Sequence, residues 1–161
     1  MIRQAKKEDV PFITDIYNEA VKNSTATFDT ICRSKEEMLQ QLLEHTGKYV
    51  FLVEEEYEII RGYASLSMYR PRNAFEESVE LSIYIDSKYK GRGIGKRFME
   101  KLIAYAKEQK DIHTIVSLIT GDNVASIGLH ERYGFIYCGQ LKEIGYKFKT
   151  YLDLNFYQLF L

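Results

Sequence analysis

The chain has 161 residues, which fits one domain large enough to bury a single hydrophobic core. Its 22 lysines and arginines nearly balance its 23 aspartates and glutamates, so no overall charge attracts it to nucleic acid or to an anionic membrane. Any site for an anion must therefore be local. The sequence has only two prolines, no repeat and no low-complexity segment, and we predict a single domain over residues 1–161.

The first residues and the cysteines bear on the compartment. The opening segment, MIRQAKKEDV, lacks the apolar stretch of a signal peptide, and no apolar run reaches the length of a membrane span. Cys32 and Cys138 are far apart and follow neither a C-x-x-C nor a metal-ligand spacing, so we expect free thiols and no metal site. These features predict a cytoplasmic protein with no membrane partner.

The first part of the chain predicts a short strand, residues 2–5, and then two helices. Apolar residues recur at helical spacing in the first helix, at Val10, Ile13, Ile16, Tyr17 and Ala20. A polar loop over residues 24–29 carries one aromatic side chain, Phe28, which we expect to be exposed. The S-x-x-E sequence at residues 34–37 has the form of a capping box and predicts the start of the second helix.

Three strands are predicted next. Residues 49–56 and 59–69 read as a β-hairpin, and a basic loop, RPRNAFEE, covers residues 70–77. Residues 78–86 alternate strictly between apolar and polar, which predicts a strand with one polar face. That polar face carries Ser78, Glu80, Ser82 and Tyr84.

The remaining elements complete an α/β pattern. They are a helix over residues 94–109, a strand over 113–120, a short helix within 121–135, and two long strands over 137–148 and 150–161. The strand, helix and strand that span residues 78–120 imply a parallel crossover inside an otherwise mixed sheet.

The stretch YKGRGIGKRF, residues 89–98, joins the polar-faced strand to its helix. Its glycines and cations alternate as Lys90, Gly91, Arg92, Gly93, Ile94, Gly95 and Lys96. Glycines at a helix entrance let free N–H groups surround an anion, so the stretch indicates a phosphate site. The plainer alternative is a tight turn with solvated charges. Neither the dinucleotide fingerprint nor the Walker A loop has this spacing.

The stretch resembles the acyl-CoA loop of the GNAT N-acetyltransferases, [QR]-x-x-G-x-[GA], with Lys90 where the family usually has Gln or Arg. Residues 123–135, NVASIGLHERYGF, resemble the second family signature, N-x-x-A-x-x-L-Y-E-K-x-G-F. The branch that acetylates phosphinothricin or methionine sulfone and sulfoximine is the most similar, through IYNEAVKNSTATFD, YRPRNAFEESVELSIYI, GLHERYGF and EIGYKFKTYLDLNFYQL. The resemblance implies a twisted, mostly antiparallel sheet flanked by helices, with a parallel, splayed pair of strands at the cofactor site.

The resemblance also implies acetyl-CoA as cofactor and a small primary amine as the acetyl acceptor. The residues expected to bind the cofactor are Ile83, Tyr84 and Ile85 through their main chain, the loop Lys90, Gly91, Arg92, Gly93, Ile94, Gly95 and Lys96, and Asn123 with Ser126. Glu80 is the predicted general base, because acetyl transfer needs a neutral amine. His130 stands where relatives often have a tyrosine, and it is predicted to be a general acid or to share the base role.

An amino-acid acceptor carries a carboxylate, which arginine can bind through two hydrogen bonds. The resemblance implies an acceptor pocket formed by Phe28, Arg70, Arg72 and Phe75, and Lys147 is a further candidate cation. Relatives are typically dimers, so we also expect a homodimer. Aromatic residues of the last two strands suit its interface: Tyr146, Phe148, Tyr151, Phe156 and Tyr157.

Three other functions remain open at this point. An acetyltransferase acting on protein amines usually has an acidic groove, and the basic loop at residues 70–77 argues against it. A non-catalytic sensor of acyl-CoA would not need Glu80 or His130. A nucleic-acid-binding module is the weakest alternative, because the chain has no basic stripe and no tryptophan.

Overall fold

The computed structural model describes residues 1–161, with seven strands in one sheet of order β1-β2-β3-β4-β5-β7-β6. The strands are β1 (Ile2–Gln4), β2 (Val50–Glu56), β3 (Ile59–Met68), β4 (Ser78–Ile85), β5 (Thr114–Thr120), β6 (Ile136–Lys147) and β7 (Thr150–Phe160). The helices are α1 (Val10–Asn23), α2 (Lys35–Leu43), α3 (Ile94–Glu108) and α4 (Val124–Arg132). The predicted strands are all confirmed, with their ends within one residue of the observed ones.

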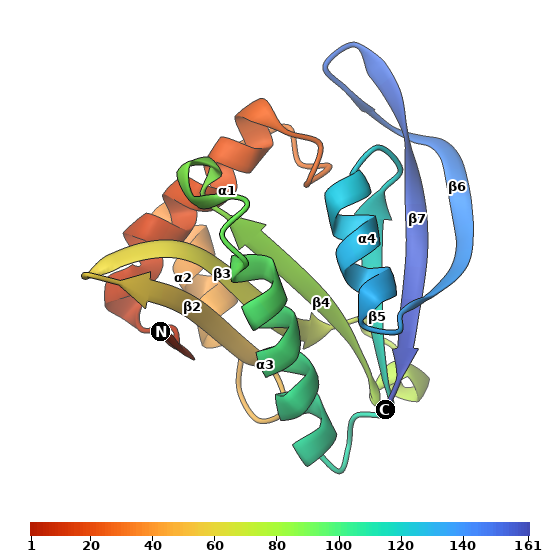
Figure 1. Cartoon of the computed structure of the whole chain (residues 1–161), viewed down its shortest axis with the longest axis horizontal. Helices are drawn as coiled ribbons and strands as arrows, with labels where there is room; N and C mark the ends of the chain where they lie inside the picture. Colours follow the sequence, from red (N-terminus) through yellow and green to blue (C-terminus); the bar gives the residue numbers. More distant parts are fainter.

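Helices cover both faces of the sheet (Figure 1). Helices α1 and α2 pack on one face of β2 and β3, where Ile13 and Met38 are fully buried. Helix α3 packs on the opposite face and buries Phe98 and Leu102 against the strands. The capping box predicted at residues 34–37 is present at the start of α2. The apolar periodicity of each helix thus selects the side that it turns to the sheet.

Strands β4 and β5 are parallel neighbours that separate along their length. Ladder pairs join them only where Ser78–Glu80 of β4 lie beside Thr114–Val116 of β5. Beyond these pairs the strands diverge into a V that opens away from the C-terminus (Figure 1). On its other edge, β4 stays paired with β3 as far as Ile85. The predicted splay is confirmed, and it leaves one main-chain edge of residues 81–85 without a neighbouring strand.

The loop over residues 24–29 lies between α1 and the β6–β7 hairpin and is held from both sides. The Lys147 ammonium on β6 donates to the carbonyl of Thr27 at 2.9 Å. The ring of Phe28 packs on Gly145, where even a single Cβ atom would overlap it. Phe28 is therefore partly buried, and the expectation that it is exposed was wrong.

The last two strands divide their aromatic side chains between the core and the surface. Tyr146, Phe148 and Tyr151 are exposed, as an interface would need. Tyr157 is only 4% exposed and belongs to the main core, so its predicted place in an interface was wrong. Alternation along β7 turns its side chain toward α4, where its hydroxyl donates to the carboxylate of Glu131 at 3.3 Å. No helix in the structure combines the length and the apolar character needed to cross a bilayer.

Candidate active site

A cavity of about 390 Å³ lies in the opening between β4 and β5, and we call it the splay cavity. It brings together the end of α1, the glycine-containing loop and the start of α4. Nine of the predicted site residues line it: Ile83, Tyr84, Ile85, Lys90, Gly91, Gly95, Asn123, Ser126 and His130. Two motifs separated in the sequence by a whole strand therefore meet at one opening.

The glycine-containing loop enters α3 through two residues with left-handed backbone conformation. Gly91 has φ of 76° and Gly93 has φ of 75°, values that L side chains adopt only with strain. Gly93 is also the N-cap of α3, so the first N–H groups of that helix lie next to the loop. Gly91 and Gly93 thus serve the backbone at a helix entrance, a geometry that favours an anion, whereas Gly95 lies within α3.

The cations of this loop point in different directions. Lys90 is the only lysine or arginine that lines the splay cavity. Arg92 lies over the ring of Tyr89, with its guanidinium carbon 5.3 Å from the ring centre. Lys96 is 3.9 Å from the carboxylate of Glu100 one helical turn away.

Arg92, Gly93, Ile94 and Lys96 are therefore the predicted cofactor residues that do not line the splay cavity. Ile94 is 1% exposed and belongs to the core, so its side chain has no access to a ligand.

A buried carboxylate, which the sequence did not reveal, anchors the glycine-containing loop to the sheet. Glu54 on β2 is 2% exposed and accepts hydrogen bonds from Nε and Nη2 of Arg97 at 2.8 and 2.5 Å. Nη1 of Arg97 donates to the carbonyl of Arg92 at 3.0 Å, and Nη2 of Arg61 is 3.3 Å from Glu54. The loop is thus tied to the sheet through Arg97.

Helix α4 carries the second motif into the splay cavity. The side chain of Asn123 caps the helix by accepting from the N–H of Ser126 at 3.2 Å. His130 is 4% exposed, and its Nδ1 is 2.7 Å from the carbonyl of Ser126. Because a carbonyl only accepts, Nδ1 carries the proton. Nε2 is then free to accept from the hydroxyl of Ser117 at 2.9 Å.

Burial lowers the pKa of His130, although its backbone partner opposes the shift. The neutral ring is therefore favoured at pH 7. A neutral imidazole whose Nε2 faces a serine hydroxyl is suited to accept a proton, and less suited to donate one.

A second cavity, of about 290 Å³, lies under the loop at residues 24–29, and we call it the loop cavity. It is lined by Phe28, by Glu80 of β4 and by polar side chains from β3. It shares five lining residues with the splay cavity: Ala26, Ser82, Tyr84, Leu118 and Thr120. The two cavities therefore meet at the gap where β4 and β5 separate.

Glu80 lies on the polar face of β4 and lines the loop cavity. Burial raises the pKa of its carboxyl, and the guanidinium of Arg70, at 3.6 Å, opposes this shift. Burial also raises the pKa of Tyr84 to about 12, so that phenol is neutral at pH 7. Glu80 is thus a partly buried carboxylate of enhanced basicity beside the gap.

The predicted acceptor residues are only partly brought together. Phe28 lines the loop cavity, whereas Arg70, Arg72 and Phe75 are exposed in the β3–β4 connection and do not line it. Arg70 still reaches Glu80, as described above. Lys147 lines neither cavity, since its ammonium is held by the Thr27 carbonyl, and burial lowers its pKa.

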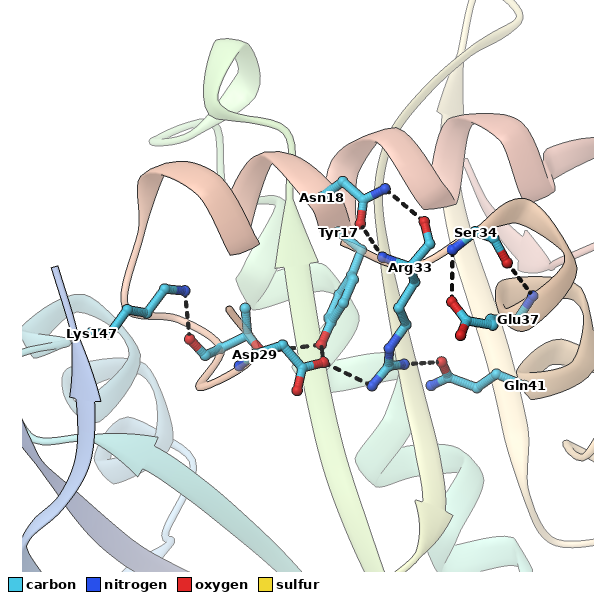
Figure 2. A network of polar contacts seen from close by, with 9 residues as sticks. Tyr17, Asn18, Asp29, Arg33, Ser34, Glu37, Gln41 and Lys147 are labelled. Atoms are coloured by element: carbon cyan, nitrogen blue, oxygen red, sulfur yellow. Dashed lines mark hydrogen bonds and ion pairs between the residues drawn. The ribbon is translucent and has the colours of Figure 1, made fainter. Parts of the chain in front are cut away.

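The loop cavity also contains a cation that the sequence did not reveal. Arg33, directly before α2, lines it together with Asp29 and Gln41, and Figure 2 shows them joined in one network. No spacing or motif marks Arg33, which precedes an ordinary capping box.

The chain matches the family model described as "Acetyltransferase (GNAT) domain" over residues 2–156. It is 36% identical to the L-methionine sulfoximine/L-methionine sulfone acetyltransferase of Pseudomonas aeruginosa PAO1, over 98% of this chain and 92% of that one. A solved phosphinothricin acetyltransferase from Sinorhizobium meliloti, in complex with AcCoA, has a TM-score of 0.96 at 34% identity and covers 100% and 88% of the two chains.

A solved ribosomal-protein-alanine N-acetyltransferase from Brucella melitensis has a TM-score of 0.95 at 38% identity and covers 100% and 99%. Together these similarities confirm the predicted family, its fold and acetyl-CoA as the cofactor.

Proposed function

We propose that this chain, which belongs to the GNAT acetyltransferase family, acetylates the primary amine of a small amino acid by direct transfer from acetyl-CoA. The acceptors we propose are methionine sulfoximine, methionine sulfone and phosphinothricin, which its relatives are named for. The observation that carries this proposal is the junction of the two cavities at the β4–β5 gap. One cavity would hold the cofactor, and the other would hold the acceptor.

The residues of the splay cavity fit acetyl-CoA. The unpaired edge of Ile83, Tyr84 and Ile85 offers main-chain N–H and C=O groups to an extended amide chain. Free N–H groups at the start of α3, with Lys90 nearby, suit a pyrophosphate. Asn123 is available for the amide arm. Acetyl-CoA supplies an activated acetyl thioester when it is bound.

We propose Glu80 as the general base that receives the proton of the acceptor's ammonium group at a carboxylate oxygen. Burial raises its pKa, which makes it a stronger base than an ordinary glutamate. Arg70, 3.6 Å away, would bind the carboxylate of the same amino acid. The ammonium and the carboxylate on the substrate's α-carbon would thus face Glu80 and Arg70, respectively, each of opposite charge.

We propose that His130 shares the movement of protons from the other side of the gap. Its Nε2 accepts from Ser117, whose hydroxyl lines the splay cavity. The proton that the amine nitrogen loses as its bond to the acetyl carbon forms would pass through that hydroxyl to Nε2, and from there to the CoA thiolate that leaves as the C–S bond breaks. Phe28 would form an apolar wall of the acceptor site, and Arg72 and Phe75 would lie at its outer rim. Lys147 would act indirectly, by holding the loop that carries Phe28.

Release of free thiol from acetyl-CoA, measured against a panel of amines, tests this function. We expect saturable turnover with the three named amino acids, and turnover at least tenfold slower with polyamines or basic peptides. Substituting Glu80→Gln and His130→Ala should each weaken the turnover. Preferred turnover of a peptide with an amino-terminal alanine would instead support protein acetylation. Tight binding of acetyl-CoA with no turnover of any amine would support a sensor.

We also propose that the chain forms a homodimer in the cytoplasm. Strand β6 is an edge strand, and exposed apolar side chains gather on the β6–β7 hairpin: Ile136, Tyr137, Leu141, Ile144, Tyr146, Phe148 and Tyr151. A patch of this kind suits a protein interface. Sedimentation equilibrium of the wild type and of Tyr146→Glu tests it. A wild type that is monomeric at micromolar concentration would contradict the proposal.

A further inference from the structure

An ion pair lines the loop cavity, and none of the roles proposed above uses it. Nη2 of Arg33 donates to Oδ2 of Asp29 at 3.0 Å, and the same oxygen accepts the hydroxyl of Tyr17 (Figure 2). The guanidinium carbon also lies 4.5 Å above the centre of the Tyr17 ring, and Nη1 donates to Gln41 at 2.5 Å. Both charged groups are thus held in fixed positions at the cavity.

The backbone beside this pair is fixed as well. The side-chain amide of Asn18 on α1 donates to the carbonyl of Arg33 and accepts from its N–H, each at 2.9 Å. The capping box of Ser34 and Glu37 starts α2 at the next residues (Figure 2). Two helices therefore place the Arg33 side chain before any ligand arrives, which is the condition for a selective contact.

The pair has no net charge but keeps hydrogen-bonding capacity. A guanidinium has five N–H groups, and the contacts with Asp29 and Gln41 use one on each terminal nitrogen. Oδ1 of Asp29 accepts no hydrogen bond from the protein. The other charged side chain of the cavity, Glu80, already has Arg70 beside it. Arg33 and Arg70 thus each face a carboxylate of the loop cavity.

We propose that the Asp29–Arg33 pair selects amino acids whose side chain ends in an uncharged polar group over those that end in an anion. The proposal rests on the proposed function and narrows it. Methionine sulfoximine and phosphinothricin share one carbon skeleton and end in a methylated tetrahedral centre, but only the phosphinate of phosphinothricin is charged. An unpaired arginine would attract that phosphinate. Asp29 offsets the attraction, whereas a sulfoximine can both donate to Asp29 and accept from Arg33.

The test is the ratio of kcat/KM for methionine sulfoximine to kcat/KM for phosphinothricin. We expect the wild type to prefer the sulfoximine by about tenfold or more, the scale of one unfavourable charge contact in a partly solvated site. Asp29→Asn should lower the ratio by about tenfold, because it leaves the Arg33 cation unopposed. Arg33→Gln should raise the ratio, because it leaves the carboxylate unopposed.

The opposite shifts of the two variants separate selection from simple damage, since a misfolded cavity would lose both substrates alike. Glu36→Gln, on the exposed side of α2, makes the same charge change outside the cavity and should leave the ratio unchanged. Titration with acetyl-CoA checks that each variant is folded. A wild type that acetylates both substrates equally, or a ratio that Asp29→Asn does not move, would overturn the inference and leave the proposed function standing. Absence of turnover with every amine would overturn both.

Discussion

The splay cavity and the loop cavity meet at one gap, yet the chain builds them differently. The splay cavity draws on two continuous motifs, and much of its binding capacity lies in the main chain of β4 and of the entrance to α3. The loop cavity draws on side chains from α1, the connection that follows it, α2 and the strands β3, β4, β5 and β7, and the loop at residues 24–29 is held in place by the β6–β7 hairpin. The comparison teaches that a proposed cofactor site built from main-chain groups leaves a compact record in sequence. A proposed acceptor site built from dispersed side chains does not.

The largest effect is expected at Glu80, where the loop cavity would perform its chemistry. Glu80→Gln removes the base and should lower kcat about 100-fold or more, with little change in the affinity for acetyl-CoA. Because burial raises the pKa of Glu80, the wild-type rate should fall on acidification at a pH above the ordinary pKa of 4.5. Steady-state rates across pH measure both effects.

Glu77→Gln is the matched control, because Glu77 is exposed one residue before the same strand. If Glu80→Gln kept the wild-type rate at pH 7, the base would have to lie elsewhere, and His130 would be the next candidate.

A substitution at Gly145 should impair amine acetylation through the loop cavity more than acetyl-CoA binding in the splay cavity. Gly145→Leu forces the Phe28 ring and its loop to move, so kcat/KM for the amine should fall about tenfold through lost positioning. The dissociation constant of acetyl-CoA, measured by titration calorimetry, should change less. Gly128→Ala in α4 is the control, because a Cβ there meets no atom within 4 Å. Equal losses in amine and cofactor binding would mean that the loop serves both cavities alike.

A smaller effect, confined to the splay cavity, is expected at Arg97. Arg97→Ala removes the side chain that links the carbonyl of Arg92 to Glu54. The KM for acetyl-CoA should rise about fivefold, which corresponds to the free energy of roughly one hydrogen bond. The value of kcat should stay near that of the wild type. Lys101→Ala, exposed on the same helix, provides the comparison. A fall in kcat with KM unchanged would contradict a role in shaping the loop.

The smallest effect concerns stability. Burial lowers the pKa of His130 below its ordinary 6.5, so the unfolded chain takes up the proton more readily than the folded one. The free energy of unfolding should therefore decrease as pH falls below about 6.5. Each proton contributes up to about 1.4 kcal/mol per pH unit.

Urea titrations at several pH values should show a shallower decrease for His130→Gln. His113→Gln, with an exposed ring, should keep the wild-type dependence. An unchanged dependence for His130→Gln would mean that other groups cause the decrease.

The sequence was sufficient for the element order because periodicity and turn residues are local signals. It also placed Glu80 correctly on the polar face of β4, since alternation alone decides that. It could not reveal the contact of Glu54 with Arg97, which joins residues 43 positions apart on a strand and a helix.

Arg33 was missed for a related reason, because its position depends on how Asn18 fixes the connection before α2. Lys147 was predicted to contact the substrate, but its ammonium binds the Thr27 carbonyl and it lines neither cavity. The sequence does not show that the carbonyl of Thr27, 120 positions away, accepts a hydrogen bond from this ammonium. Aromatic residues on β7 were likewise ambiguous, since covered and exposed positions use the same residue types.

The open edge of β4 would make the stability of the protein depend on acetyl-CoA, if the cofactor pairs with it as proposed. Residues 81–85 have a strand on one side only, so a ligand that pairs with the other side completes the sheet of the folded chain and has no counterpart in the unfolded chain. Mass action then adds free energy to the folded state, about 2.7 kcal/mol at a ligand concentration 100 times the dissociation constant. The supply of acetyl-CoA would thereby regulate how long each molecule survives unfolding and proteolysis, in addition to how fast it works.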